Sequence, residues 1–218
     1  MVIVRAMAGH HILTVGAPDQ LADSLSGIFL KGHREPRIAL VGRSNVGKSS
    51  LINALTGIRL AQVSNQPGKT RLIHCYAWKE AKKIVTDLPG YGFARTSAEE
   101  RNKWAELIGA YIRADEGLER AMVLLDSRHG PTDLDVEAIR FLSGESVPLQ
   151  FVFTKFDSLK TQSERASRKK EASAALLALG YDPKDAFWCS AKNKDLGLKQ
   201  LGEALCAAAP PTQHREVT

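Results

Sequence analysis

A glycine-rich turn between an expected strand and an expected helix constrains the fold of this chain more than any other feature. The turn lies in GRSNVGKSSLINALTG, which begins at Gly42 and directly follows the apolar run RIALV at residues 37–41. Apolar and β-branched residues before the turn predict a strand, and the helix-prone residues after it predict a helix. Glycines let such a loop curl so that backbone N–H groups point inward, and the helix N-terminus adds a positive dipole end. The sequence therefore predicts a polyphosphate site at this junction.

The spacing within the turn matches a phosphate-binding motif. Gly42, Gly47, Lys48 and Ser49 fit the pattern GxxxxGK[ST], in which the lysine reaches the β- and γ-phosphates and the hydroxyl binds Mg²⁺. A glycine-rich turn with a solvated lysine is the alternative, which the flanking strand and helix disfavour. The residues expected to surround the phosphates are Gly42, Arg43, Ser44, Asn45, Val46, Gly47, Lys48, Ser49 and Ser50.

The order of the expected elements indicates an α/β fold. After the first helix comes a long loop, and strands are then expected at 71–78, 82–88, 121–126, 148–157 and 186–191, with helices at 98–114, 134–142, 163–180 and 198–209. Strands that are apolar throughout and alternate with helices predict a mostly parallel sheet covered on both faces. Residues 1–36 and 210–218 have weak patterns, so we expect them to be mobile.

Polar residues follow the expected strands, where a parallel sheet binds its ligands. The segment DLPG, with Asp87, Leu88, Pro89 and Gly90, follows the strand expected at 82–88. A carboxylate in this place can hold Mg²⁺ through water, and a glycine N–H can contact a γ-phosphate. A buried turn without a ligand is the alternative.

Two later segments predict which base is bound. TKFD and SAK supply Thr154, Lys155, Asp157, Ser190, Ala191 and Lys192. The Asp157 carboxylate can accept hydrogen bonds from N1–H and the 2-amino group of guanine, whereas adenine offers neither donor, so GTP is favoured over ATP. The stem of Lys155 can lie along the purine plane, and Lys192 can cover the other face. Backbone N–H groups of Ser190 and Ala191 can reach guanine O6. A surface turn with a lysine and an aspartate is the alternative.

The composition indicates the size of the domain and the cellular compartment, but not the reaction that the protein catalyses. The chain has 218 residues, of which 44% are hydrophobic and 25% charged, which suits one domain with a core that needs no disulfides. Cys75, Cys189 and Cys206 lie far apart without metal-ligand spacing, so we expect reduced core residues and a cytoplasmic protein. No apolar run approaches the ~20 residues that span a bilayer, and we expect no export and no membrane association.

The charge of the chain gives a weak indication of its partners. The net charge of +6 favours polyanions such as nucleic acid, although a solvated surface explains it equally well. The run RASRKK at 165–170 lies on an expected helix, where such a run is more often a solvated face than a binding site.

Five segments occur along the chain in one order: GRSNVGKSSLINAL, QPGKTR, DLPGYGFA, TKFD and SAK. In this order and spacing they resemble the EngB (YihA/YsxC) family of bacterial translational GTPases, in the TrmE-Era-EngA-EngB-septin-like superfamily. TKFD in place of the commoner NKxD also matches this family. The resemblance covers residues 37–205 and implies a single Ras-like P-loop G domain, whose mostly parallel sheet has one antiparallel strand and helices on both faces. Residues 1–36 would be an N-terminal extension and 210–218 a tail.

The resemblance adds residues that the pattern alone did not identify. It implies that Gly68, Lys69 and Thr70 contact the nucleotide, that Thr70 closes over Mg²⁺ and the γ-phosphate, and that Ser49, Thr70 and Asp87 serve the metal. Lys48, Thr70 and Asn45 are then the expected catalytic residues. The loops at 57–71 and 87–97 would be the two switches, ordered by the γ-phosphate and released on hydrolysis.

Two residues, Tyr91 and Asn45, each have two alternative roles. Tyr91 stands where Ras-like proteins have a water-positioning glutamine, so we expect slow unaided hydrolysis; the tyrosine is either a packing residue or a partner contact. Asn45 either helps to hold a potassium ion against the phosphates or only caps the loop.

The resemblance implies a switch that binds GTP or GDP with Mg²⁺ and hydrolyses GTP during assembly of the large ribosomal subunit, with a link to cell division, septation and growth. Its expected partners are the large subunit or its precursor, meaning rRNA and ribosomal proteins, and we expect a monomer. The alternatives are a GTP-gated RNA- or protein-binding module with negligible intrinsic turnover, and an ATP-using kinase, which has no support beyond the phosphate loop.

Overall fold

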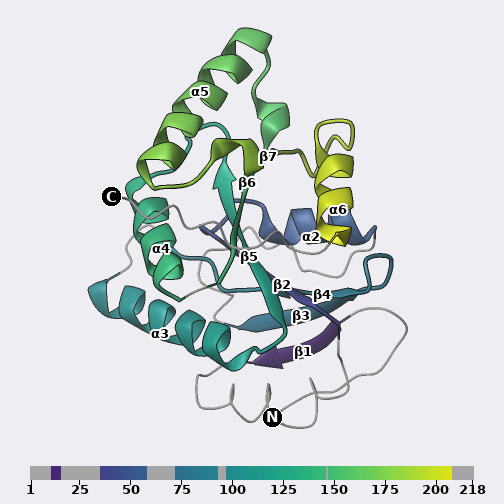
Figure 1. The fold of residues 1–218 in the computed structure, drawn as a ribbon, viewed down its shortest axis with the longest axis vertical. Coiled ribbons are helices and arrows are strands. Elements are labelled where there is room, and N and C mark those ends of the chain that lie inside the picture. Colours follow the sequence, from purple (N-terminus) through teal and green to yellow (C-terminus); the bar gives the residue numbers. More distant parts are fainter. Residues whose placement is uncertain (1–10, 16–34, 58–71, 93–96, 146, 208–218) are drawn as a thin grey trace.

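A seven-stranded sheet forms the centre of the fold (Figure 1). The computed structural model of the protein describes residues 11–15, 35–57, 72–92, 97–145 and 147–207. The strand order in the sheet is β1-β3-β4-β2-β5-β6-β7. The strands are β1 (His11–Val15), β2 (Arg37–Gly42), β3 (Ile73–Trp78), β4 (Lys83–Asp87), β5 (Leu118–Asp126), β6 (Leu149–Thr154) and β7 (Phe187–Trp188).

The strand directions confirm the expected fold class. Strand β2 pairs in parallel with β4 and β5, and β5, β6 and β7 continue the parallel series. Strand β3 is the antiparallel strand, because it runs against both β4 and β1. This is a mostly parallel sheet with one antiparallel strand, as the sequence predicted.

One expectation was wrong at the start of the chain. The weakly patterned residues 1–36 were expected to be mobile, but residues 11–15 form the edge strand β1, in which Thr14 pairs with His74. The run HILTV at 11–15 has the apolar and β-branched residues of a strand, so the signal was present in the sequence. Its partner strand lies about 60 residues away, so the pairing depends on tertiary structure. The rest of that segment before residue 35, and residues 208–218, lie outside the described residues.

Helices cover both faces of the sheet (Figure 1). Helices α2 (Lys48–Thr56) and α6 (Leu198–Cys206) pack on one face, and α3 (Ala98–Ala114), α4 (Asp133–Gly144) and α5 (Gln162–Ala178) pack on the other. Strand β2 supplies both cores, since Ile38 and Leu40 face α2 and α6 while Ala39 and Val41 face the other layer. Burial on two faces explains why the central strands are apolar throughout. None of the described helices is long and apolar enough to cross a membrane.

Two expected strands end earlier than the sequence pattern predicts. Strand β6 stops at Thr154, because Lys155 adopts a left-handed backbone conformation with φ 58° and residues Phe156–Ser158 form a short 3-10 helix, η2. Strand β7 contains only Phe187 and Trp188. The TKFD and SAK segments therefore lie in loops just beyond the strands.

Two of the three cysteines lie in the core, as expected. Cys75 and Cys189 are buried, and burial raises the pKa of each thiol to about 12. Cys206, at the end of α6, is exposed rather than in the core, so that expectation was wrong for this residue. All three are free thiols.

Candidate nucleotide-binding site

The polar segments predicted from the sequence meet at the carboxyl ends of β2, β4, β6 and β7. The hydroxyl of Thr154, at the end of β6, donates to the carbonyl of Val46 in the phosphate loop at 2.7 Å, and the ammonium group of Lys155 donates to the carbonyl of Asn45 at 2.7 Å. The hydroxyl of Ser190, after β7, donates to Oδ1 of Asp157 at 2.7 Å. Residues far apart in sequence thus form one continuous site. Gly68, Lys69 and Thr70 lie outside the described residues.

The phosphate loop joins the end of β2 to the first residue of α2. Gly47 occupies the N-cap with φ 111°, a left-handed conformation that side chains rarely adopt. The side chain of Val46 is buried and fixes the loop to the core, whereas Asn45 is exposed. No side chain caps α2 and its first turn, with Lys48, Ser49 and Ser50, has no acidic residue. Free N–H groups at such a helix terminus suit an anion.

A half-buried lysine and a buried carboxylate of opposite charge lie at the start of α2. Asp87, the last residue of β4, is 4% exposed, and its Oδ2 accepts a hydrogen bond from the Ser49 hydroxyl at 3.1 Å. Burial raises the pKa of Asp87, and the Lys48 charge and the Ser49 hydrogen bond oppose that shift. Burial lowers the pKa of Lys48, and the Asp87 charge opposes it. Both groups are therefore poorly solvated, and each depends on a charged neighbour.

The environment of Asp87 fits a divalent cation. Its Oδ1 is buried and has no hydrogen-bond partner among the described residues. A hydroxyl and a carboxylate with an unsatisfied oxygen are ligands of the hard-oxygen type that Mg²⁺ takes. In the described part of the chain no group of three or more His, Cys, Asp or Glu residues could hold a metal, so any ion here also needs other oxygens, such as those of phosphates.

The DLPG turn lies directly against the phosphate loop. A Cβ atom on Gly90 would lie 2.9 Å from Nζ of Lys48 and 3.0 Å from the backbone N of Ser44, so a larger residue would crowd both the lysine and the phosphate loop. The N–H of Ser44 donates to the carbonyl of Tyr91 at 2.9 Å. Leu88 is fully buried, and the carbonyl of Pro89 accepts from the indole of Trp104 at 2.7 Å.

The loops after β6 and β7 hold Asp157 in one orientation. The Ser190 hydroxyl that donates to Asp157 also accepts the backbone N–H groups of Lys192 and Asn193, each at 3.0 Å. Ser190 is fully buried, Ala191 is half-buried and Lys192 is exposed. A carboxylate fixed in this way can select a ligand by its hydrogen-bond donors.

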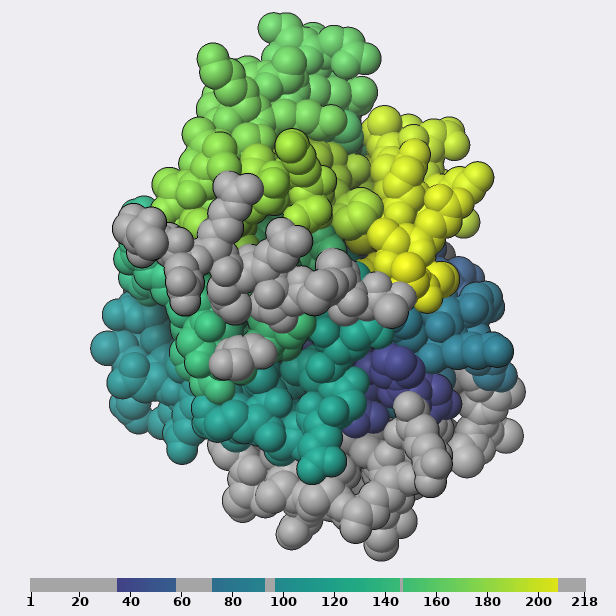
Figure 2. Space-filling model, in the orientation of Figure 1, coloured from purple at the N-terminus to yellow at the C-terminus, as the bar shows by residue number. Residues whose placement is uncertain are grey.

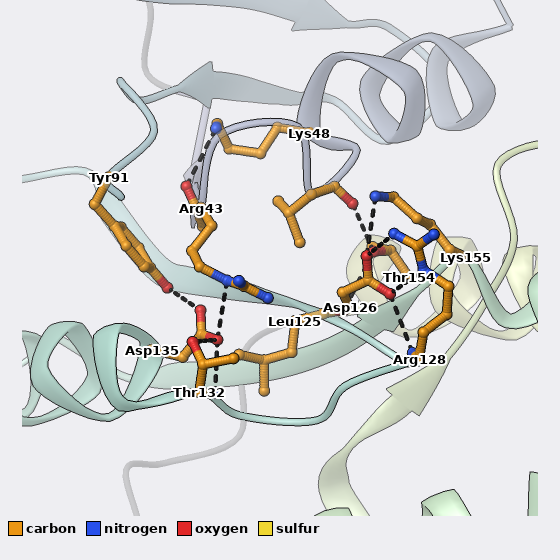
Figure 3. Close-up of polar contacts among 12 residues, drawn as sticks. Arg43, Lys48, Tyr91, Leu125, Asp126, Arg128, Thr132, Asp135, Thr154 and Lys155 are labelled. Carbon is orange, nitrogen blue, oxygen red and sulfur yellow. Dashed lines mark hydrogen bonds and ion pairs between the residues drawn. The ribbon is translucent and has the colours of Figure 1, made fainter. Parts of the chain in front are cut away.

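Sequence reasoning missed Asp126 and Arg128. Figure 3 shows that Asp126, at the end of β5, binds Arg128 through both carboxylate oxygens, at 2.9 and 2.7 Å, and also accepts from Lys155 at 2.9 Å. Burial would raise the pKa of Asp126, but the hydrogen bonds from Arg128 and Lys155 hold it well below its ordinary value. The rule that identified Asp87, a carboxylate at the end of a buried strand, would also have found Asp126.

Tyr91 is turned into the protein. The residue is 8% exposed, and its hydroxyl donates to Oδ1 of Asp135 at 2.8 Å (Figure 3). Its ring meets the edge of Trp104 with centroids 5.2 Å apart. Burial and then the nearby Asp135 charge raise the pKa of the phenol. This geometry supports the packing alternative, because the phenol points away from Lys48.

Known proteins are similar to this chain in sequence and in fold. The sequence model of a 50S ribosome-binding GTPase family matches residues 37–155. A probable GTP-binding protein EngB from Desulfovibrio desulfuricans is 41% identical over 184 residues, which cover 84% of this chain and 88% of that relative. The chain belongs to the EngB family of GTP-binding proteins. The resemblance inferred from the five sequence segments is thereby confirmed.

Solved structures support the same assignment. The crystal structure of a probable EngB protein has a TM-score of 0.56 and 26% identity, covering 77% of this chain and 95% of that chain. Era of Aquifex aeolicus, crystallised with GDP·AlF4⁻, has a TM-score of 0.61 at 22% identity over 81% of this chain and 57% of its own, which shows a common fold. This EngB-family chain therefore has the Ras-like GTPase fold.

Proposed function

We propose that this EngB-family protein binds and hydrolyses GTP and that its GTP-bound form acts in assembly of the large ribosomal subunit. The observation that carries the proposal is the cluster of half-buried Lys48 and Ser49 with buried Asp87 at the start of α2, where one Asp87 oxygen has no hydrogen-bond partner among the described residues. A lysine, a hydroxyl and a carboxylate in this arrangement suit a nucleoside triphosphate with its metal ion.

Each residue of the cluster has a distinct role in the proposal. Lys48 neutralises charge that develops on the β- and γ-phosphates, and Ser49, Thr70 and Asp87 hold Mg²⁺. The bound Mg²⁺ supplies positive charge beside the phosphate oxygens. The Gly90 N–H contacts the γ-phosphate, which the close approach of Gly90 to Lys48 supports. Water attacks the γ-phosphorus, the bond to the bridging oxygen breaks, and GDP and phosphate are formed.

Base selection in the proposal depends on Asp157. Its carboxylate, oriented by Ser190, accepts the two guanine donors, while the Lys155 stem covers one face of the purine and Lys192 the other. Gly68, Lys69 and the remaining loop residues complete the nucleotide contacts.

The proposed partner is the large ribosomal subunit or its precursor. Support comes from the matched family, which is described as ribosome-binding, and from the net charge of +6. We place the protein in the cytoplasm as a monomer, with a link to cell division and septation through ribosome supply. Because a switch needs a difference in affinity, the GTP form must bind the subunit better than the GDP form.

Sedimentation with purified large subunits tests this function. We expect at least about tenfold stronger binding with a non-hydrolysable GTP analogue than with GDP, a difference of about 1.4 kcal/mol. Binding should weaken as salt rises, since contacts to RNA phosphates release counterions. Equal binding with both nucleotides would contradict the switch, even if the protein hydrolyses GTP.

A GTP-gated binding module with negligible turnover is the second candidate. The observation that favours it is the buried Tyr91, because the position used by a water-positioning glutamine in Ras-like proteins points into the protein. Phosphate release measured with and without large subunits separates the two: a rate that rises on subunits supports a GTPase switch, and a rate that stays near zero supports the binding module.

A further inference from the structure

A buried carboxylate outside the expected nucleotide contacts joins three parts of the molecule. Asp135, in the first turn of α4, is fully buried. Its Oδ1 accepts from the Tyr91 hydroxyl at 2.8 Å, and its Oδ2 accepts from the N–H and the hydroxyl of Thr132 at 2.9 and 2.7 Å (Figure 3). Nε of Arg43 lies 3.1 Å from the same Oδ2, as an ion pair. A buried charge with this many donors is well compensated and holds its neighbours firmly.

Two of these partners belong to the walls of the phosphate site. Arg43 is the second residue of the phosphate loop, and Tyr91 directly follows Gly90. The two also meet through their backbones, since Arg43 and Tyr91 form a parallel β-bridge and the N–H of Ser44 donates to the Tyr91 carbonyl at 2.9 Å. The backbone bridge joins Arg43 to Tyr91, and Asp135 joins the same two residues through their side chains.

The contacts around Arg43 and Tyr91 also restrain the neighbouring Gly90. The space for a Cβ at Gly90 is closed by Lys48 on one side, at 2.9 Å. On the helix side the turn is held twice, by the Trp104 indole, which donates to the Pro89 carbonyl at 2.7 Å, and by Asp135 through Tyr91. The Gly90 peptide is thus fixed between α3, α4 and the phosphate loop.

We propose that Asp135 is a positioning residue, which acts through Tyr91 to hold the Gly90 peptide beside Lys48 where the γ-phosphate binds. The inference rests on the proposed function and adds a specific role to that site. The γ-phosphate distinguishes GTP from GDP, so a residue that positions its contact governs the preference for GTP. Base contacts through Asp157 do not pass through Asp135, and the phosphate loop is joined to Asp135 by a separate ion pair from Arg43. Pre-arranged contacts raise affinity because the ordering cost is already met.

Two variants test the role from both ends of one hydrogen bond. Tyr91→Phe removes only the phenol hydroxyl, and Asp135→Asn removes the charge at nearly constant volume. Dissociation constants are measured for GDP and for a non-hydrolysable GTP analogue with Mg²⁺. In Tyr91→Phe we expect the ratio of analogue affinity to GDP affinity to fall about fivefold or more, while the affinity for GDP changes by less than about twofold. Asp135→Asn should lower the same ratio, and its GDP affinity also reports the loss of the ion pair with Arg43. The double variant should add little beyond Asp135→Asn alone, because the hydroxyl that Tyr91→Phe removes acts through Asp135.

The chain offers a matched control in Tyr111. This tyrosine is fully buried, its hydroxyl donates to a buried carboxylate, Asp115 Oδ2, at 2.7 Å, and the Thr86 hydroxyl lies 3.0 Å from the same phenol oxygen. Asp115 pairs with Arg37, at the end of β2 opposite to the phosphate loop. Tyr111→Phe should therefore lower the free energy of unfolding, as Tyr91→Phe does, but leave the nucleotide ratio unchanged.

The outcomes separate this inference from the proposed function. If Tyr91→Phe behaves like Tyr111→Phe, with lower stability and the ratio of the unmutated protein, Asp135 has a structural role only and the inference is wrong. If the unmutated protein binds neither nucleotide, the proposed function itself fails. Tyr91→Phe retains the ring that packs against Trp104, so it remains informative if Asp135→Asn does not fold.

Discussion

At the scale of single residues, Lys155 connects the two halves of the site. Its ammonium group donates to the Asn45 carbonyl in the phosphate loop and to Asp126 at the end of β5, while its backbone adopts a left-handed conformation. Such a conformation is unusual for a residue with a side chain and is retained where the surroundings enforce it. The lysine thus fixes the base-side loop relative to the phosphate loop before any ligand binds.

Asn45 provides a prediction about monovalent ions. It is exposed in the phosphate loop, with φ 62°, and its carbonyl is already held by Lys155. If its side chain helps to hold potassium against the phosphates, the ion supplies charge that an arginine supplies elsewhere. We expect GTP hydrolysis to be faster in potassium than in sodium at equal ionic strength, and Asn45→Ala to lose this difference. Phosphate release measures both, and a rate indifferent to the exchange would exclude the ion.

Asp126 provides a prediction about pH. Its folded-state pKa lies below its unfolded value of about 3.9, so the stability it contributes is present above about pH 5 and is lost as pH falls through the folded-state pKa. Asp126→Asn should lower the free energy of unfolding by about 1–2 kcal/mol at pH 7, since Arg128 is partly exposed and its pair is screened. Denaturant unfolding at pH 7, 5 and 3 should show this deficit shrinking at pH 3. A deficit of equal size at all three values would mean that packing, not charge, is responsible.

At the scale of elements, helix α5 carries the basic run at 165–170, which is either a ribosome contact or a solvated face. Figures 1 and 2 show it at one end of the long axis of the molecule. Its basic run is not uniform. Lys169 and Lys170 are both exposed, but Nζ of Lys169 lies 5.2 Å from the ring centre of Phe156 and 5.8 Å from that of Trp188, and Arg168 pairs with Glu171. Part of the run therefore packs against the protein.

Lys170 is accordingly the residue with which to test α5 as a ribosome contact. If this face meets rRNA phosphates, Lys170→Glu should weaken sedimentation with large subunits and reduce its dependence on salt. Lys199→Glu is the matched control, because it reverses a similarly exposed lysine on α6. Equal binding by both variants and the unmutated protein would identify the basic run as a solvated face.

Prediction from sequence succeeded for elements and failed where contacts are long-range. Helix α3 matches its expected bounds, because Ser97 and Glu100 form a capping box that is visible in the sequence. The edge strand β1 and the early ends of β6 and β7 were missed, since pairing partners and backbone turns decide them. The segments that meet at the carboxyl edge of the sheet were identified from the sequence, but the burial of Tyr91 against Asp135 depends on how α4 packs, which no local pattern reveals.

At the scale of the whole molecule, the parallel sheet explains why a site can be assembled from distant segments. Strands β2, β4, β5, β6 and β7 run in one direction, so their carboxyl ends, from Gly42 to Trp188, lie at one edge. Two hydrophobic cores, one on each face, hold these ends in fixed positions. The loops after β2, β6 and β7 are joined by hydrogen bonds from Thr154, Lys155 and Ser190. The site is therefore built on rigid elements.

Nucleotide selectivity at Asp157 tests the central claim most directly. Competition against labelled GDP is measured with GTP, ATP and xanthosine triphosphate for the unmutated protein, Asp157→Asn, and the control Asp182→Asn, whose carboxylate caps η3 (Pro183–Asp185). We expect the unmutated protein and the control to prefer GTP. Asp157→Asn should lose about 2–3 kcal/mol of GTP affinity and gain affinity for xanthosine triphosphate, because xanthine presents a carbonyl acceptor where guanine has an amino group. Equal affinity of the unmutated protein for ATP and GTP would contradict the account.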